Sequence, residues 1–204
     1  QIISGSRNRN LIVIDCSQNI SPLEKPGGKI DASMGDIHSE GNPHYWLDPL
    51  NGKTIAATIK DALVEIAPEY EMYFRQLYEK FCNEVDDSVK RWQKDYAVLR
   101  GSEIIFYHNS WPYFEQRFGL NAVEFIEPKP GIMPSPSHIK ILIDVIQNNH
   151  VKVIAMEPYF SDNAPEYLSK KTGISIVQMA QSVGAVEGAG SYIELFDYNL
   201  KILW

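Results

Sequence analysis

The second half of the chain alternates between short apolar runs and segments whose apolar residues recur at helical spacing. The apolar runs are typical of buried strands, and each is followed by a segment typical of a helix. The predicted strands span 104–107, 122–126, 151–156 and 174–179, and the predicted helices span 111–118, 135–148, 162–171 and 189–203. Repeated strand–helix units predict an α/β fold, with a parallel sheet flanked by helices.

Two longer helices are predicted upstream of this part. Pro49–Ile66 carries apolar residues at helical spacing. Residues 69–96 continue with an aromatic-rich stripe, which predicts a helix of roughly 40 Å whose stripe packs against other elements. Nearer the start, the apolar run 11–14 predicts a buried strand, and residues 21–41 are rich in loop-forming Pro, Gly, Ser and Asp.

Charge and motif content argue against several classes of function. The chain carries 26 acidic and 19 basic residues, a net charge of −7, which argues against nucleic acid as a partner. No apolar run reaches the roughly 18 residues of a membrane span. The glycine-rich phosphate motifs, the G-x-S-x-G elbow and the H-E-x-x-H helix are absent. Cys16 and Cys82 are too few for a disulfide framework, and we expect separate buried thiols, with a bridge left open.

Three polar side chains are predicted to meet at one edge of the sheet. His108 directly follows the first predicted strand, Glu157 the third and Gln181 the fourth. In open α/β sheets, ligands gather at the carboxyl ends of the strands. His44 lies on another part of the chain and could face this edge across a cleft. Because neutral imidazole is the commonest ligand of transition metals, the pattern predicts a metal site.

The loop that carries His44 is predicted to be stiff. Pro43 restrains the residue before it to extended geometry. Asp48 and Pro49 form a helix-start signal, because Asp caps free N–H groups and Pro is tolerated at the first helical position. A stiff loop can hold a ligand in place with little loss of entropy on binding.

Four blocks of sequence resemble a known family, in that family's order. Residues 41–49, GNPHYWLDP, resemble the NPH-x-W-L-D-P segment of the cluster A-I metal-binding proteins. These are the zinc and manganese solute-binding components of bacterial ABC importers. Residues 107–114 resemble the H-x-x-(W/F)-x-Y-F segment, and 156–160 and 192–199 continue the match.

The resemblance implies a domain organisation. Residues 1–66 would be the remnant of an N-terminal lobe, 67–98 a bridging helix, and 99–204 the C-terminal α/β lobe. In this family, the rest of the N-terminal lobe and the export signal would lie upstream.

The resemblance also implies binding and release of an ion, without enzymatic chemistry. The protein would capture Zn²⁺, or alternatively Mn²⁺, between its lobes and deliver it to a membrane permease. It would act as a periplasmic or otherwise extracytoplasmic monomer, with a lipid anchor left open for the full-length protein. His44 and His108 match ligand positions of the family. The fourth ligand is commonly Asp, where this chain has the weaker neutral amide of Gln181, so the carboxylate of Glu157 is an equal alternative. Capping or ion pairing is the other role open to Glu157.

Other readings remain open at the level of the sequence. A metal-dependent hydrolase could use the same histidine pair, with Glu157 as base. A siderophore- or chelate-binding relative and an adhesion protein with a structural metal are further alternatives. His38 is interpreted as either a solvated loop residue or a transient metal ligand. His138 and His150 are expected at the surface, and the 127–131 loop is expected to be structural.

Overall fold

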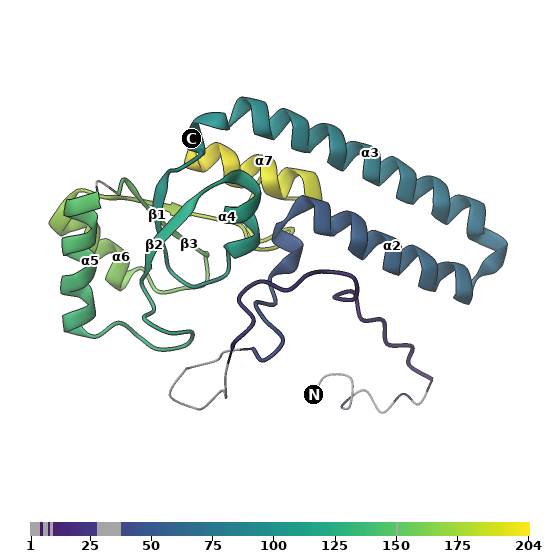
Figure 1. The fold of residues 1–204 in the computed structure, drawn as a ribbon, viewed down its shortest axis with the longest axis horizontal. Helices are drawn as coiled ribbons and strands as arrows, with labels where there is room; N and C mark the ends of the chain where they lie inside the picture. Colours follow the sequence, from purple (N-terminus) through teal and green to yellow (C-terminus); the bar gives the residue numbers. More distant parts are fainter. Residues whose placement is uncertain (1–4, 6–7, 9, 28–37, 150) are drawn as a thin grey trace.

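The C-terminal part of the protein is a layered α/β unit from which two long helices extend (Figure 1). The computed structural model describes residues 5, 8, 10–27, 38–149 and 151–204. The two long helices are α2 (Pro49–Ile66) and α3 (Glu71–Asp95), which pack against each other and are joined by the short 3₁₀ helix η3 (Pro68–Tyr70). Pro68 opens that turn, so the segment predicted as one helix from residue 69 begins with a 3₁₀ turn.

The predicted parallel sheet is confirmed. Its four strands run parallel in the order β2-β1-β3-β4. The strands are β1 (Glu103–Phe106), β2 (Asn121–Phe125), β3 (Val153–Met156) and β4 (Ser175–Gln178). The helices that follow them are α4 (Pro112–Phe118), α5 (Pro136–Asn149), α6 (Asn163–Thr172) and α7 (Tyr192–Leu203). This chain order explains why sequence periodicity was enough to predict the architecture.

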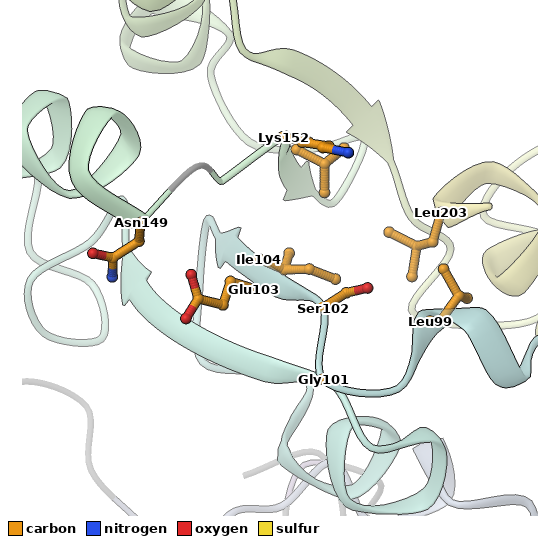
Figure 2. Close-up of a pocket in the computed structure, with 9 residues that line it drawn as sticks. Leu99, Gly101, Ser102, Glu103, Ile104, Asn149, Lys152 and Leu203 are labelled. Carbon is orange, nitrogen blue, oxygen red and sulfur yellow. The ribbon is translucent and has the colours of Figure 1, made fainter.

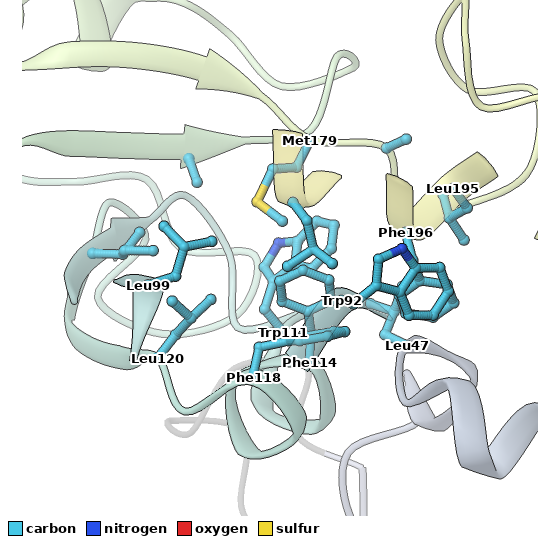
Figure 3. Packing of buried hydrophobic residues seen from close by; sticks show 14 of the residues in the cluster. Leu47, Trp92, Leu99, Trp111, Phe114, Phe118, Leu120, Met179, Leu195 and Phe196 are labelled. Atoms are coloured by element: carbon cyan, nitrogen blue, oxygen red, sulfur yellow. The ribbon is translucent and has the colours of Figure 1, made fainter. Parts of the chain in front are cut away.

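Each face of the sheet is covered by a separate hydrophobic cluster. Side chains of β1 alternate between them, because successive residues of a strand point to opposite faces. Ile104 and Phe106 join the cluster under α3, α4 and α7, whereas Ile105 and Tyr107 join the one under α5 and α6. Figure 3 shows the first cluster, where Trp92 of α3 lies against Phe196 of α7. Helix α3 is therefore anchored to the sheet through its C-terminal half.

Glycine ends two of the helices as their sequences predict. Gly119 follows α4 with φ 72°, and Gly173 follows α6 with φ 79°. Glycine adopts this left-handed conformation without the strain a Cβ would add. The last helix begins at Tyr192 instead of residue 189, because the Ser191 hydroxyl caps it by accepting the N–H of Glu194.

Two predictions of burial are wrong. Residues 11–14 form no strand, and their side chains are 38–63% exposed. In the part of the chain that the structure describes, no strand lies beside them to pair with their backbone. The aromatic stripe is only partly packed near its start, where Tyr70 of η3 and Tyr73 of α3 are each 57% exposed, while Phe74 and Tyr78 are half-buried.

Histidine and cysteine positions also differ from expectation in part. His138, expected at the surface, is buried because α5 lies against β2, and its Nε2 donates to the carbonyl of Phe125 at 2.8 Å. His150 lies outside the described residues. Cys16 and Cys82 are both free, which confirms separate thiols, although both are half-buried. None of the helices in the described ranges has the length and apolar character needed to cross a membrane.

Candidate metal centre

The loop that carries His44 leads into α2 through the short helix η2 (Tyr45–Leu47). The predicted helix start is confirmed, because Asp48 Oδ1 accepts the N–H of Leu50 at 2.9 Å. Arg117 of α4 donates two hydrogen bonds to the same carboxylate, each 2.7 Å long. Such bidentate pairs are stronger and more directional than single bonds between neutral groups. The start of α2 is thereby clamped to the C-terminal part of the chain.

Four further hydrogen bonds tie this loop to parts of the chain 67 to 146 residues away. Two involve Trp46: its Nε1 donates to the carbonyl of Gln181 (2.8 Å), and its own carbonyl accepts from Tyr192 Oη (2.7 Å). The other two involve Asn42: its Nδ2 donates to the carbonyl of Asn109 (2.8 Å), and its own carbonyl accepts from Tyr113 Oη (3.0 Å). The loop is thus held directly against the carboxyl edge of the sheet.

His44 and His108 lie side by side at this edge. Their ring centroids are 6.1 Å apart, and the rings are inclined by 80°. His108 follows β1, as predicted, whereas His44 arrives on the clamped loop. The two imidazoles come from segments 64 positions apart in the sequence, so only the tertiary fold brings them together.

The hydrogen bonds of His44 define its tautomer. The Asn42 amide nitrogen donates to Glu24 Oε2 at 3.0 Å and to the carbonyl of Asn109, so its oxygen faces His44. That oxygen lies 2.8 Å from His44 Nδ1. Because an amide oxygen can only accept, Nδ1 carries the proton and the lone pair is on Nε2.

His108 is held in the same way by a carboxylate. Its Nδ1 lies 2.7 Å from Glu127 Oε2, so Nδ1 donates and Nε2 keeps the lone pair. Within the described residues, no hydrogen bond engages Nε2 of either His44 or His108. Ligand histidines usually donate their other N–H in this manner, which orients the ring and raises its basicity.

The local electrostatics keep His44 neutral. Burial, followed by the electrostatic effects of His108 and His38, lowers its pKa from 6.5 to about 4. A neutral imidazole with a free nitrogen is the form that binds metal. His38 itself is exposed, so its two interpretations remain open.

Glu157 is fully buried at the end of β3. Neither carboxylate oxygen has a hydrogen-bond partner, and the polar atoms of Ser110 and Trp111 are unpartnered as well. Burial raises the pKa of Glu157, an effect that nearby Ser110, His108 and Trp111 partly offset. A buried carboxyl group whose hydrogen-bonding capacity is incompletely satisfied is costly, so Glu157 marks an electrostatically unusual position near His108.

Gln181 lies beside the loop of His44. Its Oε1 accepts the hydroxyl of Tyr159 at 2.7 Å, and its carbonyl accepts from Trp46. The Trp46 ring lies 5.4 Å from that of His44. Burial, followed by the charges of Glu157 and Glu127, raises the pKa of Tyr159 to about 12, so its hydroxyl stays a donor.

The four predicted site residues are therefore placed unequally. The rings of His44 and His108 are neighbours, whereas Glu157 lies near His108 and Gln181 beside Trp46. Across the described ranges, no three His, Cys, Asp or Glu side chains are grouped closely enough to hold a metal by themselves.

The sequence interpretation missed two residues, Asn42 and Glu127, which hold the imidazoles. Glu127 directly follows the predicted strand 122–126, just as His108 follows its own strand. The rule that found His108 therefore also applied to Glu127, which was instead assigned to a structural loop. Asn42 lies in the NPH segment that carries the family resemblance, but no role was predicted for its side chain.

Hollows lie on both sides of the histidine pair. One of about 320 Å³ is lined by His108, Glu127 and the turn that follows Glu127. Another of about 530 Å³ is lined in part by His38 and by residues next to His44. A third, of about 350 Å³, lies at the amino ends of β1 and β3, where Glu103 and Lys152 line it (Figure 2). Because His108 follows the carboxyl end of β1, this third hollow is at the opposite edge of the sheet.

Sequence comparisons connect this geometry to zinc uptake. The high-affinity zinc uptake system protein ZnuA of Brucella abortus is 29% identical over 117 residues, which cover 57% of this chain and 35% of that protein. The zinc-binding lipoprotein AdcA of Streptococcus pneumoniae is 22% identical over 184 residues, which cover 88% of this chain and 37% of that protein. The chain thus spans about a third of the length of these curated relatives.

Solved structures share the fold. A crystal structure of ZnuA superposes with a TM-score of 0.79 at 26% identity, covering 96% of this chain and 71% of that one. The laminin-binding adhesin Lmb of Streptococcus agalactiae gives a TM-score of 0.77 at 22% identity, with coverages of 93% and 68%. The family described as zinc-uptake complex component A, periplasmic, matches residues 1–203. This chain therefore belongs to the ZnuA family of zinc-uptake components.

Proposed function

We propose that the protein captures Zn²⁺ outside the cytoplasm and delivers it to the membrane permease of an ABC importer. The observation that carries this proposal is the pair formed by His44 and His108, whose ring centroids lie 6.1 Å apart and whose Nδ1 atoms are each engaged in a hydrogen bond. Membership of a periplasmic zinc-uptake family supports the same function, as do the names of the relatives. These findings favour transport over the hydrolase and chelate-binding alternatives.

His44 and His108 are proposed as two of the zinc ligands. Imidazoles that share one Zn²⁺ at about 2.0–2.1 Å have ring centroids roughly 5 Å apart. The observed separation of 6.1 Å therefore needs a shift of only about 1 Å. Nitrogen-rich sites suit zinc better than the oxygen-preferring Mn²⁺, which stays the alternative ion.

Glu157 and Gln181 are proposed as candidates for the remaining positions. Glu157 offers a buried carboxyl group near His108, Ser110 and Trp111. Gln181 offers a neutral oxygen on the side of His44, and this oxygen already accepts from Tyr159. A ligand from outside the described residues would complete either arrangement.

We further propose that residues 1–66 belong to an N-terminal lobe, 67–98 to the bridging helix and 99–204 to the C-terminal lobe. The anchoring of α3 by its second half supports this division. The bonds from Arg117 and Tyr192 to the loop of His44 favour a pair of imidazoles that moves as one unit. Ion capture would then involve little motion between His44 and His108 themselves.

Replacement of His108 tests the function. We expect His108→Ala to weaken Zn²⁺ binding by more than the roughly tenfold to hundredfold typical of losing an outer-shell partner, because a direct ligand is removed. Titration calorimetry on the full-length protein measures this. His138→Ala is the matched control: its imidazole is buried but bonded to Phe125, so stability should fall while zinc affinity is kept. Equal zinc affinity in the wild type and His108→Ala would refute the assignment.

Replacement of Gln181 tests the ligand set. We expect Gln181→Glu to tighten Zn²⁺ binding about tenfold, because a carboxylate binds a divalent ion more strongly than an amide of the same shape. The Tyr159 hydroxyl can still donate to the new side chain, so the local bond is preserved. Chelator competition measures the change. An unchanged affinity in Gln181→Glu, together with a weakened one in Glu157→Gln, would exclude Gln181 and leave Glu157 as the oxygen ligand.

A further inference from the structure

Backbone pairing between β1 and β2 brings His108 and Glu127 together. The strands are parallel neighbours, and their pairing continues beyond the strand ends. The N–H of Glu127 donates to the carbonyl of Tyr107 at 3.0 Å, and that of Ile126 donates to the carbonyl of Phe106 at 2.9 Å. His108 and Glu127, each just beyond a strand end, are therefore set beside each other by the backbone pairing of the sheet.

The Glu127 carboxylate is itself fixed. Its Oε2 accepts the N–H of Gly131 at 3.1 Å in addition to His108 Nδ1 at 2.7 Å. Gly131 has a φ of 76°, a conformation that glycine adopts readily, and this turns its N–H back toward the strand end. The side chains of Glu127 and His108 are only 11% and 21% exposed, so water screens their interaction little.

Aromatic packing limits how the His108 ring can move. Phe160 lies 5.8 Å from it, tilted by 35°, and Phe160 is in turn stacked on Tyr107 at 4.3 Å. The His44 ring lies on another side. With its faces confined, the ring can still change which nitrogen carries the proton, and the bond to Glu127 governs that choice.

We propose that Glu127 is a positioning residue that holds His108 as the Nδ1–H tautomer and thereby presents the Nε2 lone pair to the ion shared with His44. The proposal rests on the zinc-binding function proposed above. A neutral histidine in water favours the opposite, Nε2–H tautomer, in which the nitrogen needed for the ion is blocked. Carboxylate partners of this kind orient the ring of a ligand histidine and favour its binding of metal.

The tautomer can be observed in the apo protein. Long-range ¹H–¹⁵N NMR of the full-length protein distinguishes protonated from unprotonated imidazole nitrogens. We expect His108 to be Nδ1–H in the wild type and mainly Nε2–H in Glu127→Ala. Glu127→Gln should keep the Nδ1–H form, because its amide oxygen can accept from both donors. His44, held by Asn42, should be unchanged in every variant and serves as the internal reference.

Zinc affinity, measured by chelator competition, provides the second readout. We expect a loss of about tenfold to hundredfold in Glu127→Ala and less than about tenfold in Glu127→Gln. Glu127→Asp shortens the side chain by one methylene, so it should behave like Glu127→Ala and replaces that variant if it does not fold. Glu166→Ala removes an exposed carboxylate paired with Lys170 and should change neither readout.

The outcomes separate the two proposals. If His108 stays Nδ1–H without the Glu127 carboxylate, or if the tautomer changes with no loss of zinc affinity, the positioning role is wrong. If the wild-type protein binds no zinc, the proposed function fails, while the tautomer measurement still decides whether Glu127 orients His108.

Discussion

At the scale of single residues, burial shifts the pKa of a carboxyl group in α4. Glu115, in α4, is a half-buried carboxyl whose side chain accepts the N–H of Ala122 at 3.0 Å. Burial raises its pKa from 4.5 to about 7, although the bond from Ala122 acts in the opposite direction. Since the folded-state pKa lies above that of the unfolded chain, the folded state binds more protons between these two values, and protonation favours folding.

The pH dependence of stability follows from this shift. The contribution of Glu115 to the free energy of unfolding should be fully present below pH 4.5 and lost as the pH rises through about 7. Glu115→Gln keeps an acceptor for the N–H of Ala122 but does not titrate. At pH 8 its free energy of unfolding should therefore exceed that of the wild type by on the order of 1–2 kcal/mol. Urea unfolding at pH 5 and pH 8 measures this. A difference between the two proteins that is independent of pH would contradict the assignment.

At the scale of elements, the start of α2 is where the two parts of the chain are locked together. Gly52 is needed there, because a Cβ at this position would lie 2.5 Å from the ring of Tyr192. A glycine within a helix normally costs about 1 kcal/mol. Here it lets the Tyr192 hydroxyl reach the carbonyls of Trp46 and Asp48, at 2.7 and 3.2 Å.

The ion pair between Arg117 and Asp48 is the stronger of these two contacts, and its loss should lower the free energy of unfolding. Arg117→Met leaves Asp48 largely buried without its cation, so we expect the free energy of unfolding to fall by roughly 2–3 kcal/mol, less than for a fully buried pair. Zinc affinity should fall too, because the loop of His44 loses its clamp. Chemical denaturation and chelator competition measure both effects.

A matched pair on the surface provides the control for Arg117. Arg75 and Glu71 are half-exposed and one helical turn apart, so Arg75→Met should cost less than about 0.5 kcal/mol. Similar decreases in the free energy of unfolding in Arg117→Met and Arg75→Met would contradict a special role for the Arg117–Asp48 pair.

At the scale of the whole molecule, the α/β unit and the two long helices differ in how much of their apolar surface is buried. The sheet and its flanking helices enclose two hydrophobic clusters. Large apolar side chains lie exposed along α2 and α3, among them Ile66, Met72 and Leu77, and along residues 11–14. The candidate site of His44 and His108 lies where the α/β unit meets the loop that leads into these two helices, whose arrangement Figure 1 shows.

Local patterns in the sequence were enough to predict the helices from residue 49 onward and the parallel sheet, but not the absence of a strand at residues 11–14. Period-2 and helical spacing, glycine helix ends and the Asp48–Pro49 start are local signals, and strand–helix alternation leaves few topologies. For the same reason His108 could be assigned to the carboxyl edge of the sheet. The pattern also pointed to His44, although only as a residue that could face that edge.

How the two imidazoles are held depends on contacts between segments that are distant in the sequence. The bond from His108 to Glu127 depends on the register of two strands, and the tautomer of His44 depends on an amide fixed by Glu24 and Asn109. The burial of His138 and the exposure of residues 11–14 were mispredicted for a related reason. These properties depend on which distant segments become neighbours, and local periodicity carries no information about such contacts.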